Sequence, residues 1–384
     1  MSGGDIPMKR PRRIFFVIFA LVLLVIIIVV AVVTTPGTNS RLPGLTNIFS
    51  PRSAAIAADE FSFSIGRDRS FVCLDGAVAG AGSLGVQVFD AEGRETLRES
   101  FHMTEPAIVQ AGGNAIAFDI NGNSVRVFTG TEVIAGFEAG GTIVSASINQ
   151  TGWFTVVTQE GGGSRGTVRV YNSSGNEVYT VTLGSGFVLS AELSHDNSNL
   201  AVLNLTPYGS RVTIYQGLNP GDPDYVFDLI DGLIIDIFYL RDGNILALST
   251  DSVILIDNSG TGIPVFTFYG NRLGGYTFND DFITLHIYDY GLGYTGRIIT
   301  LQADGTILGE MNTNRGIISM SSDSDLLMVL QNDGLSIFTK TLESLAAPED
   351  VTYIVGASNI LALGNNTALA TNDHSALVIR LDTD

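Results

Sequence analysis

One sequence pattern recurs along most of this chain and restricts the fold more than any other feature. A short apolar stretch ending in an aromatic or aliphatic residue runs into a polar turn, as in VQVFD, VRVFT and VRVYN. Eight such stretches occur, and they end at Asp90, Thr129, Asn172, Gln216, Asp257, Gln302, Thr339 and Asp382. Successive stretches are 37 to 45 residues apart. This period, with four short strands per unit, is typical of a β-propeller, so the repeat predicts an all-β fold.

The sequence between these stretches fits short strands joined by tight turns. From Glu60 onward, runs rich in Val, Ile, Phe, Tyr and Thr alternate with Gly, Asn and Asp, and helical periodicity is nearly absent. The 44 glycines suit such a chain because tight β-turns need positive φ angles. We expect units to begin near Phe71, Pro106, Gly141, Phe187, Leu233, Gly275 and Ile317.

The end of the chain decides how many blades the propeller has. The last unit, Ile360–Leu381, holds only three strands. We expect the alternating segment Glu60–Gly66 (EFSFSIG) to supply the fourth strand, because this would close the ring and pair an open sheet edge. The result is an eight-bladed β-propeller in residues 59–384. A seven-bladed propeller is the alternative if residues 317–359, the weakest unit, do not form a blade.

The N-terminal region contains a candidate membrane anchor. Residues 14–33 are 20 consecutive apolar residues without a charge, and a helix of this length spans a bilayer core of roughly 30 Å. The run is preceded by Lys9, Arg10, Arg12 and Arg13, and only Arg41 follows closely. The positive-inside rule therefore predicts a cytoplasmic N-terminus and an extracytoplasmic remainder.

A cleaved signal peptide is the alternative for this apolar run. Its apolar core is usually about 7–15 residues and is followed by an A-x-A-like site, which is absent here. We therefore expect a cytoplasmic tail at residues 1–13, a transmembrane helix at 14–33 and a flexible linker at 34–58. The linker contains Pro36, Pro43 and Pro51 among Gly, Ser, Thr and Asn, without a period of 2 or 3.6.

Charge and cysteine content restrict the partners and the compartment. Residues 1–13 carry a net charge of +3, so the remainder of a chain whose total is −19 carries −22. Such a domain repels nucleic acid, and it suits a basic partner, divalent cations or simply solubility. Cys73 is the only cysteine, so no intramolecular disulfide can form, and a bacterial surface fits better than a eukaryotic secretory pathway. We interpret Cys73 as a small buried apolar residue.

The turns resemble those of known propellers. The segments Phe89–Glu95 (FDAEGRE), Leu193–Leu203 (LSHDNSNLAVL) and Leu240–Leu248 (LRDGNILAL) are similar to turns of bacterial WD40-like and quinoprotein-like propellers. With its single N-terminal anchor, the chain resembles an uncharacterised bacterial family of membrane-anchored β-propellers, a domain of unknown function. This resemblance supplies no catalytic residues. The repeated docking tryptophans of quinoprotein dehydrogenases are missing, so we expect no cofactor.

Metal-binding and catalytic patterns are weak. The four histidines, which lie in different units without metal-ligand spacing, are His102, His195, His286 and His374. Three acidic pairs are Asp222 and Asp224, Asp280 and Asp281, and Asp323 and Asp325. None of the pairs matches the loop pattern of a Ca²⁺ site, so we expect solvated turns and no bound metal.

One loop departs from the repeating pattern. The segment His286–Gly296 (HIYDYGLGYTG) places Tyr288, Tyr290 and Tyr294 among glycines, and Tyr208 lies in the corresponding loop two units earlier. Tyrosine is enriched at protein interfaces, so these four residues are candidate partner-binding residues. An aromatic hairpin that packs on itself is the alternative.

These observations favour a non-catalytic role. We expect a membrane-anchored, extracytoplasmic propeller that binds or scaffolds a protein partner at the bacterial cell envelope. The alternative is an enzymatic propeller, a hydrolase or a lyase, with a site in the central channel. Three or more acidic, histidine or arginine side chains converging in one deep pocket at the channel mouth would favour that alternative.

Overall fold

The computed structural model describes residues 56–159, 166–219, 221–289, 295–346, 354, 356–364, 367–372 and 375–381. The tail expected at 1–13, the membrane helix expected at 14–33 and most of the linker expected at 34–58 lie outside these residues. Within the described residues, no helix is long and apolar enough to cross a membrane. This part of the chain forms strands β1 to β32, arranged as eight four-stranded antiparallel sheets.

The first four sheets, called blades 1 to 4, follow one another along the chain. Blade 1 comprises β2 (Ser70–Leu74), β3 (Ala77–Gly82), β4 (Gly85–Phe89) and β5 (Glu95–Ser100). Blade 2 comprises β6 (Pro106–Ala111), β7 (Asn114–Asp119), β8 (Ser124–Thr129) and β9 (Val133–Glu138). Blade 3 comprises β10 (Thr142–Ile148), β11 (Phe154–Gln159), β12 (Gly166–Tyr171) and β13 (Glu177–Leu183). Blade 4 comprises β14 (Phe187–Leu193), β15 (Asn199–Thr206), β16 (Gly209–Gln216) and β17 (Tyr225–Ile230).

The remaining sheets, blades 5 to 8, complete the set. Blade 5 comprises β18 (Ile234–Tyr239), β19 (Ile245–Ser249), β20 (Ser252–Ile256) and β21 (Gly262–Thr267). Blade 6 comprises β22 (Arg272–Phe278), β23 (Ile283–Tyr288), β24 (Gly296–Leu301) and β25 (Ile307–Thr313). Blade 7 comprises β26 (Ile317–Asp323), β27 (Leu326–Gln331), β28 (Gly334–Thr339) and β29 (Ser344–Ala346). Blade 8 comprises β30 (Asn359–Gly364), β31 (Thr367–Thr371), β32 (Ser375–Leu381) and β1 (Ile56–Ser62).

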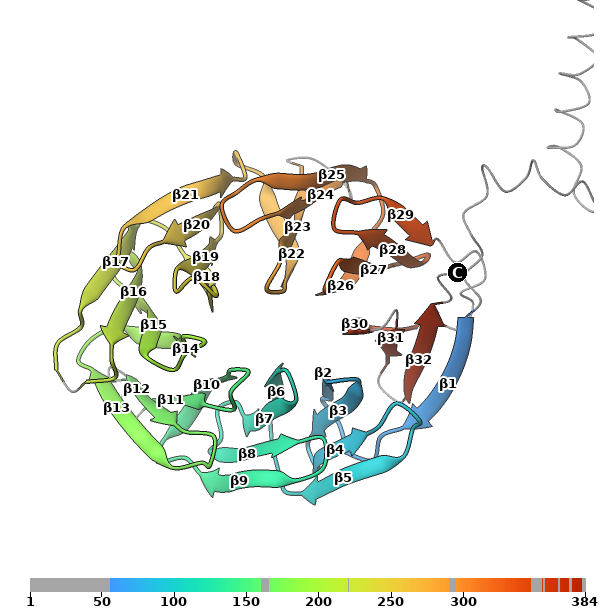
Figure 1. Ribbon diagram of the computed structural model, residues 1–384, viewed down its shortest axis with the longest axis horizontal. Coiled ribbons are helices and arrows are strands. Elements are labelled where there is room, and N and C mark those ends of the chain that lie inside the picture. The colour runs from blue at the N-terminus through green and yellow to red at the C-terminus, as the bar shows by residue number, and fades with distance from the viewer. Residues whose placement is uncertain are drawn as a thin grey trace, which may run out of the picture. The chain divides into compact units, whose positions relative to one another are not determined.

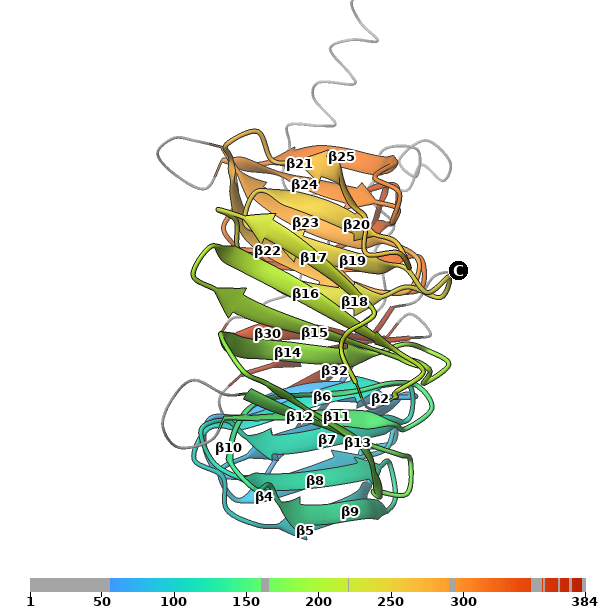
Figure 2. The ribbon, with the colours of Figure 1, turned by 90° about the vertical axis from the view of Figure 1, so that its left-hand side faces the viewer.

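The eight blades form a ring, and we call the region enclosed by their first strands the central channel (Figure 1). The first strand of each blade lies nearest the channel and the last lies at the periphery, and Figure 2 views the ring from the side of blade 4. The eight-bladed prediction is confirmed, and the seven-bladed alternative is wrong because residues 317–346 form blade 7. Blade starts agree with the expected ones within three residues, and the largest difference is at β22, which begins at Arg272 instead of Gly275.

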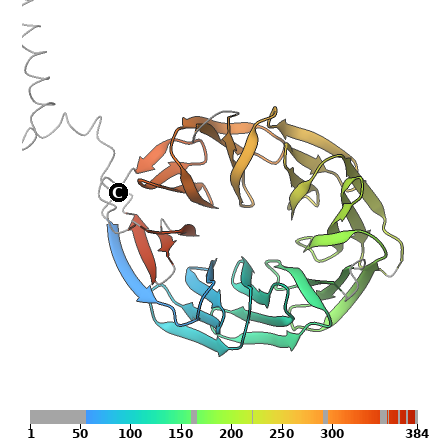
Figure 3. The same cartoon turned by 180° about the vertical axis from the view of Figure 1, so that it is seen from behind.

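The ring closes through a strand from the opposite end of the chain, as expected. β1 pairs antiparallel with β32, from Ile56 opposite Leu381 to Ser62 opposite Ser375, and the two strands lie side by side in Figure 3. The position of the closing strand differs from the prediction, because it spans residues 56–62 instead of 60–66. Its first three residues therefore come from the segment that we expected to be linker.

The reason for this shift is packing at the junction between blades 8 and 1. Phe63 and Ile65 follow β1 and are each only 3% exposed. The Phe63 ring makes edge contacts with Phe71 and Phe89, both with ring centroids 4.9 Å apart. The apolar alternation in EFSFSIG thus reflects burial between two blades as well as strand pairing.

Apolar side chains hold neighbouring blades together. The buried residues of the described part group into eight clusters, one at each junction between consecutive blades. Middle strands are covered on both faces, so β19 (ILALS) is buried throughout, whereas the outer strand β17 (YVFDLI) alternates between exposed and half-buried residues. This difference explains why the sequence shows continuous apolar runs in some strands and alternation in others.

The recurring polar turns satisfy their own hydrogen bonds. The Asn172 side-chain Oδ1 accepts the backbone N–H groups of Ser174 and Asn176, both at 3.0 Å. Gly175 has a φ of 77°, a conformation that favours glycine. Asp257 forms the same pair of bonds two blades later. The Ser259 hydroxyl also donates a hydrogen bond to Asp257, and this bond together with the two backbone bonds holds the pKa of Asp257 below its usual value. The polarity of these turns therefore serves chain reversal and needs no ligand.

Candidate functional site

The structure describes only two of the four candidate partner-binding tyrosines. Tyr290 and Tyr294 lie outside the described residues. Tyr208, between β15 and β16, is 74% exposed. Tyr288, the last residue of β23, is half-buried, with its ring 4.3 Å from the ring of His286. Tyr208 is thus available at the surface and Tyr288 packs within its own blade, and a binding role for the four residues stays a prediction.

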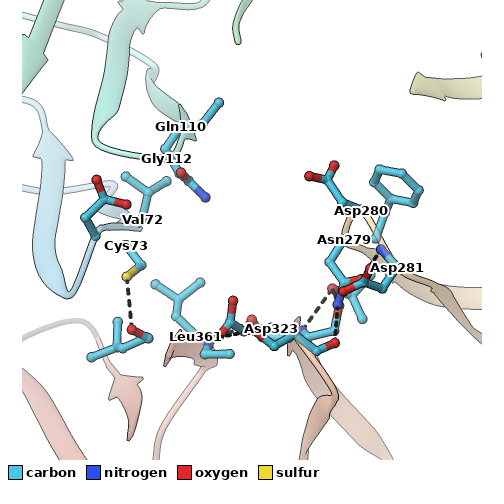
Figure 4. A pocket seen from close by; sticks show the side chains of 18 of the residues that line it. Val72, Cys73, Gln110, Gly112, Asn279, Asp280, Asp281, Asp323 and Leu361 are labelled. Atoms are coloured by element: carbon cyan, nitrogen blue, oxygen red, sulfur yellow. Dashed lines mark hydrogen bonds between the residues drawn. The ribbon is translucent and has the colours of Figure 1, made fainter. Parts of the chain in front are cut away.

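A cavity of about 760 Å³ lies where the turns between first and second strands meet the central channel. We call it the mouth cavity (Figure 4). Seven of the eight blades contribute lining residues, which places the cavity on the axis of the ring. Its charged lining residues are Asp75, Arg241, Asp280, Asp281 and Asp323. More than three charged groups therefore converge there, and acidic groups predominate.

The turn between β22 and β23 carries the central carboxylates of this cavity. Asn279 Oδ1 accepts the backbone N–H groups of Asp281, at 2.9 Å, and Phe282, at 3.0 Å. Phe282 is 1% exposed and anchors the end of the turn in the apolar core. These contacts hold Asp280 and Asp281 at the tip of the turn, beside the mouth cavity (Figure 4).

Asp280 contacts side chains from three other blades. Its Oδ2 accepts hydrogen bonds from Arg241 Nη2 at 2.7 Å and from Gln150 Nε2 at 3.2 Å. Its Oδ1 lies 3.7 Å from His195 Nε2. The Asp280 carboxylate raises the pKa of the Arg241 guanidinium through this hydrogen bond and charge pair. The turns of blades 3, 4, 5 and 6 are thereby linked across the channel.

A smaller recess of about 200 Å³ adjoins the mouth cavity. We call it the side recess, and it shares Gln110, Ala111, Gln150, Phe278 and Asp280 with the mouth cavity. The residues that distinguish its chemistry are Glu192, His195, Phe238 and Tyr239. Blades 2 to 6 contribute to this lining. The side recess therefore includes residues of blade 4, the blade that contributes none to the mouth cavity.

Two acidic residues near the side recess, Glu192 and Asp236, lie in the first strands β14 and β18. Both residues keep some exposed surface along the channel, yet protein atoms surround their carboxyl groups. Burial, together with the neighbouring Asp236 carboxylate, raises the pKa of Glu192 well above its usual value. Burial also raises the pKa of Asp236, although Tyr276 Oη donates a hydrogen bond to it at 2.8 Å. Both carboxyl groups therefore bind their protons more tightly than exposed carboxyl groups do.

Two buried polar atoms beside the recess have no hydrogen-bond partner within the described part of the chain. They are the hydroxyl oxygen of Tyr239 and Nδ1 of His195. Tyr239 is only 6% exposed, and burial raises the pKa of its hydroxyl. A buried polar group without a partner costs free energy, so these atoms need an explanation that the fold itself does not supply.

Cys73 lines the mouth cavity, and His374 lies outside the described residues. Cys73 is half-buried beside the mouth cavity, its Sγ lies 3.7 Å from the carbonyl oxygen of Leu363, and burial raises the pKa of its thiol. A raised pKa disfavours the nucleophilic thiolate. Among the described residues, no group of three or more His, Cys, Asp or Glu side chains is arranged to hold a metal ion.

Sequence reasoning missed most of this site. Asp280 and Asp281 lie in an exposed turn, as expected, and Asp323 is the last residue of β26, but the cavity that all three line was not expected. Glu192 and Asp236 were overlooked, although each is a single acidic residue in an otherwise apolar or small-residue first strand, VLSAELS or LIIDIFY. An isolated charge at that position of a unit is the signal that would have identified them.

Comparisons with known proteins agree with the fold. A model of a family of unknown function (DUF5711) matches residues 57–344. The crystal structure of the C-terminal WD40 domain of Sif2 is similar, with 13% identity and a TM-score of 0.56 over 84% of this chain and 99% of that one. The crystal structure of Citrobacter koseri AztD is similar with 11% identity and a TM-score of 0.51, over 72% and 84%. No curated protein sequence matches.

Proposed function

The chain belongs to the family of unknown function DUF5711, so its role must be inferred from its own site, and we propose a membrane-anchored, extracytoplasmic binding module. In this proposal the mouth cavity receives a cationic segment of a protein partner at the cell envelope. The anchor is the apolar run at residues 14–33, and the positive-inside rule supports the orientation. A propeller suits such a role because it presents a broad loop face around a channel mouth.

One observation carries the proposal. Asp75, Asp281 and Asp323 all line the mouth cavity, and none of them forms an ion pair with another described residue. Only Asp280 is neutralised there, by Arg241. Three carboxylates that share one concave surface raise the local concentration of cations and favour association with a positively charged partner.

The size of the cavity also fits recognition of a short segment. Its volume of about 760 Å³ lies within the range of roughly 300–1,000 Å³ that is usual for ligand sites. The net charge of −22 outside residues 1–13 adds a long-range attraction for basic partners. Both features support a basic peptide segment better than an acidic or apolar one.

An enzymatic propeller, a hydrolase or a lyase, is the second candidate. It is favoured by the convergence of charged groups in the mouth cavity and by Glu192, whose raised pKa suits a general acid. Turnover in a screen of hydrolase and lyase substrates, abolished by Glu192→Gln, would support this candidate. No turnover in this screen would remove the candidate, and unchanged turnover in Glu192→Gln would remove Glu192 as its general acid.

A titration with a basic peptide tests the binding proposal. We expect the full-length protein in detergent to bind an oligolysine peptide in isothermal titration calorimetry, more weakly as salt rises. The double variant Asp281→Asn/Asp323→Asn should weaken binding by about tenfold, because two carboxylates that line the cavity are lost. The matched control is Glu132→Gln/Asp222→Asn, which removes the same charge from exposed turns away from the cavity.

The control separates a site from a general charge effect. Equal weakening in both double variants would mean that overall charge attracts the peptide, and the proposed site would be wrong. No measurable binding by the unmodified protein at low salt would also contradict the proposal.

A further inference from the structure

We propose that the side recess binds the side-chain ammonium group of one lysine of the partner, with the Glu192 carboxyl group as its counter-ion. This inference rests on the proposed function, because the rest of the partner segment would occupy the mouth cavity. It adds a specific anchor point to what is otherwise an electrostatic attraction.

The unpartnered polar atoms of the recess point to a ligand. The Tyr239 hydroxyl and His195 Nδ1 are buried and lack a hydrogen-bond partner among the described residues, and both residues line the recess. An ammonium group donates three hydrogen bonds, which Tyr239 and Glu192 can accept. A ligand donor would thus remove the cost of leaving the Tyr239 hydroxyl unpaired.

The recess also offers an aromatic wall. Phe238 stacks on Phe278 with their ring centroids 4.3 Å apart, and both line the recess. The face of an aromatic ring attracts a cation, and the apolar ring surface accommodates the methylene groups of a lysine side chain. Carboxyl groups combined with aromatic rings favour an organic ammonium ion over a small hydrated metal ion.

The recess adjoins the mouth cavity, so a lysine side chain of a segment bound there lies beside it. The two share Gln110, Gln150, Phe278 and Asp280 as lining residues. A lysine side chain that leaves the mouth cavity therefore passes these residues to reach Glu192. The crossing contact between Gln150 and Asp280 lies at this boundary.

Binding in the recess should release a proton. The ionisable groups nearest Glu192 are Asp236 and Tyr239 on β18. His195, in the turn after β14, and Asp280 of blade 6 also line the recess, and Tyr276 of blade 6 contacts Asp236. Without a cation, burial and Asp236 favour the protonated Glu192 carboxyl group. An arriving ammonium group favours the carboxylate, so the proton of Glu192 passes to the solvent as the ion pair forms.

The test uses full-length protein in detergent and a capped five-residue peptide with one lysine among glycines. Calorimetric titrations in phosphate and in Tris give the number of protons released. We expect net proton release and tighter binding at pH 8 than at pH 6. The same peptide with norleucine or Nε-acetyllysine in place of lysine should bind at least about tenfold more weakly, because the charged donor is lost.

Three variants locate the lysine. Glu192→Gln should weaken binding about tenfold and abolish proton release, and Tyr239→Phe should weaken it several-fold while keeping the ring. Glu132→Gln is the control, and thermal unfolding verifies that each variant is folded. If Glu192→Gln is folded and still binds the lysine peptide with unchanged affinity and proton release, the inference is wrong.

The outcome also separates this inference from the proposed function. If Asp281→Asn/Asp323→Asn weakens oligolysine binding but Glu192→Gln and Tyr239→Phe do not, the mouth cavity binds cations and the recess does not hold a lysine. If neither peptide binds, both proposals fail together.

Discussion

Glu192 illustrates how the ring gives a single residue its chemistry. Its carboxyl group is surrounded by protein and faces Asp236, and both features raise its pKa. A carboxyl group with a raised pKa binds its proton more tightly in the folded state. Its contribution to stability is therefore present below the unfolded pKa of about 4.3 and is lost as pH rises toward the folded pKa.

We predict that Glu192→Gln changes the pH dependence of stability. At pH 8 the variant should have a free energy of unfolding about 1 kcal/mol higher than the unmodified protein, because no buried carboxylate has to be formed. At pH 4 the difference should nearly vanish. Urea unfolding of both proteins at the two pH values measures this. A variant that is less stable by the same amount at both pH values would contradict the prediction.

The carboxylates of the recurring turns act in a different pH range. Asp90, Asp257 and Asp304 have pKa values below the usual range, chiefly because side-chain or backbone groups of their own turns donate hydrogen bonds to them. Their contribution is present at neutral pH and is lost only as pH falls below about 4. Glu132→Gln, an exposed substitution in the β8–β9 turn, controls for a general loss of negative charge.

At the scale of the elements, closure of the ring depends on residues just after β1. Phe63 is 3% exposed and contacts the rings of Phe71 and Phe89 at the junction of blades 8 and 1. We predict that Phe63→Ala lowers the free energy of unfolding by about 3–4 kcal/mol in urea unfolding, through lost burial and a cavity. Phe187→Ala, at a side chain 53% exposed in β14, should cost less than about 1 kcal/mol.

The comparison between Phe63→Ala and Phe187→Ala tests whether packing at the junction of blades 8 and 1 contributes to ring closure. Similar small losses in both variants would mean that the junction of blades 8 and 1 contributes little and that pairing of β1 with β32 alone closes the ring. That result would contradict the packing argument made for EFSFSIG.

The strands were predictable because their signal is local. Apolar runs, turn residues and the period of about 42 residues lie within single blades, so the number and order of blades followed from the sequence. The register of β1 was not predictable in the same way. It depends on pairing with β32, more than 300 residues away, and on the burial of Phe63 and Ile65 between two blades.

The site was less predictable than the fold because it exists only in the closed ring. Asp280 meets Gln150, 130 residues earlier, across the channel, and no local pattern encodes that contact. The repeating turns, by contrast, were correctly interpreted as structural, since Asn172 satisfies its own turn. The tyrosine loop departs from the repeat of apolar strands and polar turns over several residues, whereas Glu192 and Asp236 are single acidic residues within strands that otherwise follow it.

At the scale of the whole molecule, the proposed orientation is open to a direct test. With Cys73→Ala as background, the variant Glu132→Cys carries the only thiol of the chain, in an exposed turn. We predict that a membrane-impermeant maleimide labels it on intact cells as fully as after lysis. Labelling only after lysis would contradict an extracytoplasmic propeller. Labelling of the purified variant confirms that the thiol is reactive.

Docking of a partner in the mouth cavity can be tested in the membrane-embedded protein. Gln110 lines this cavity and is exposed, so a photo-reactive amino acid in its place would probe the site in the intact, membrane-embedded protein. We predict one defined crosslinked partner from position 110, none from position 132, and loss of the crosslink in Asp281→Asn/Asp323→Asn. Equal crosslinking from both positions, or a crosslink that the double variant leaves unchanged, would contradict the claim.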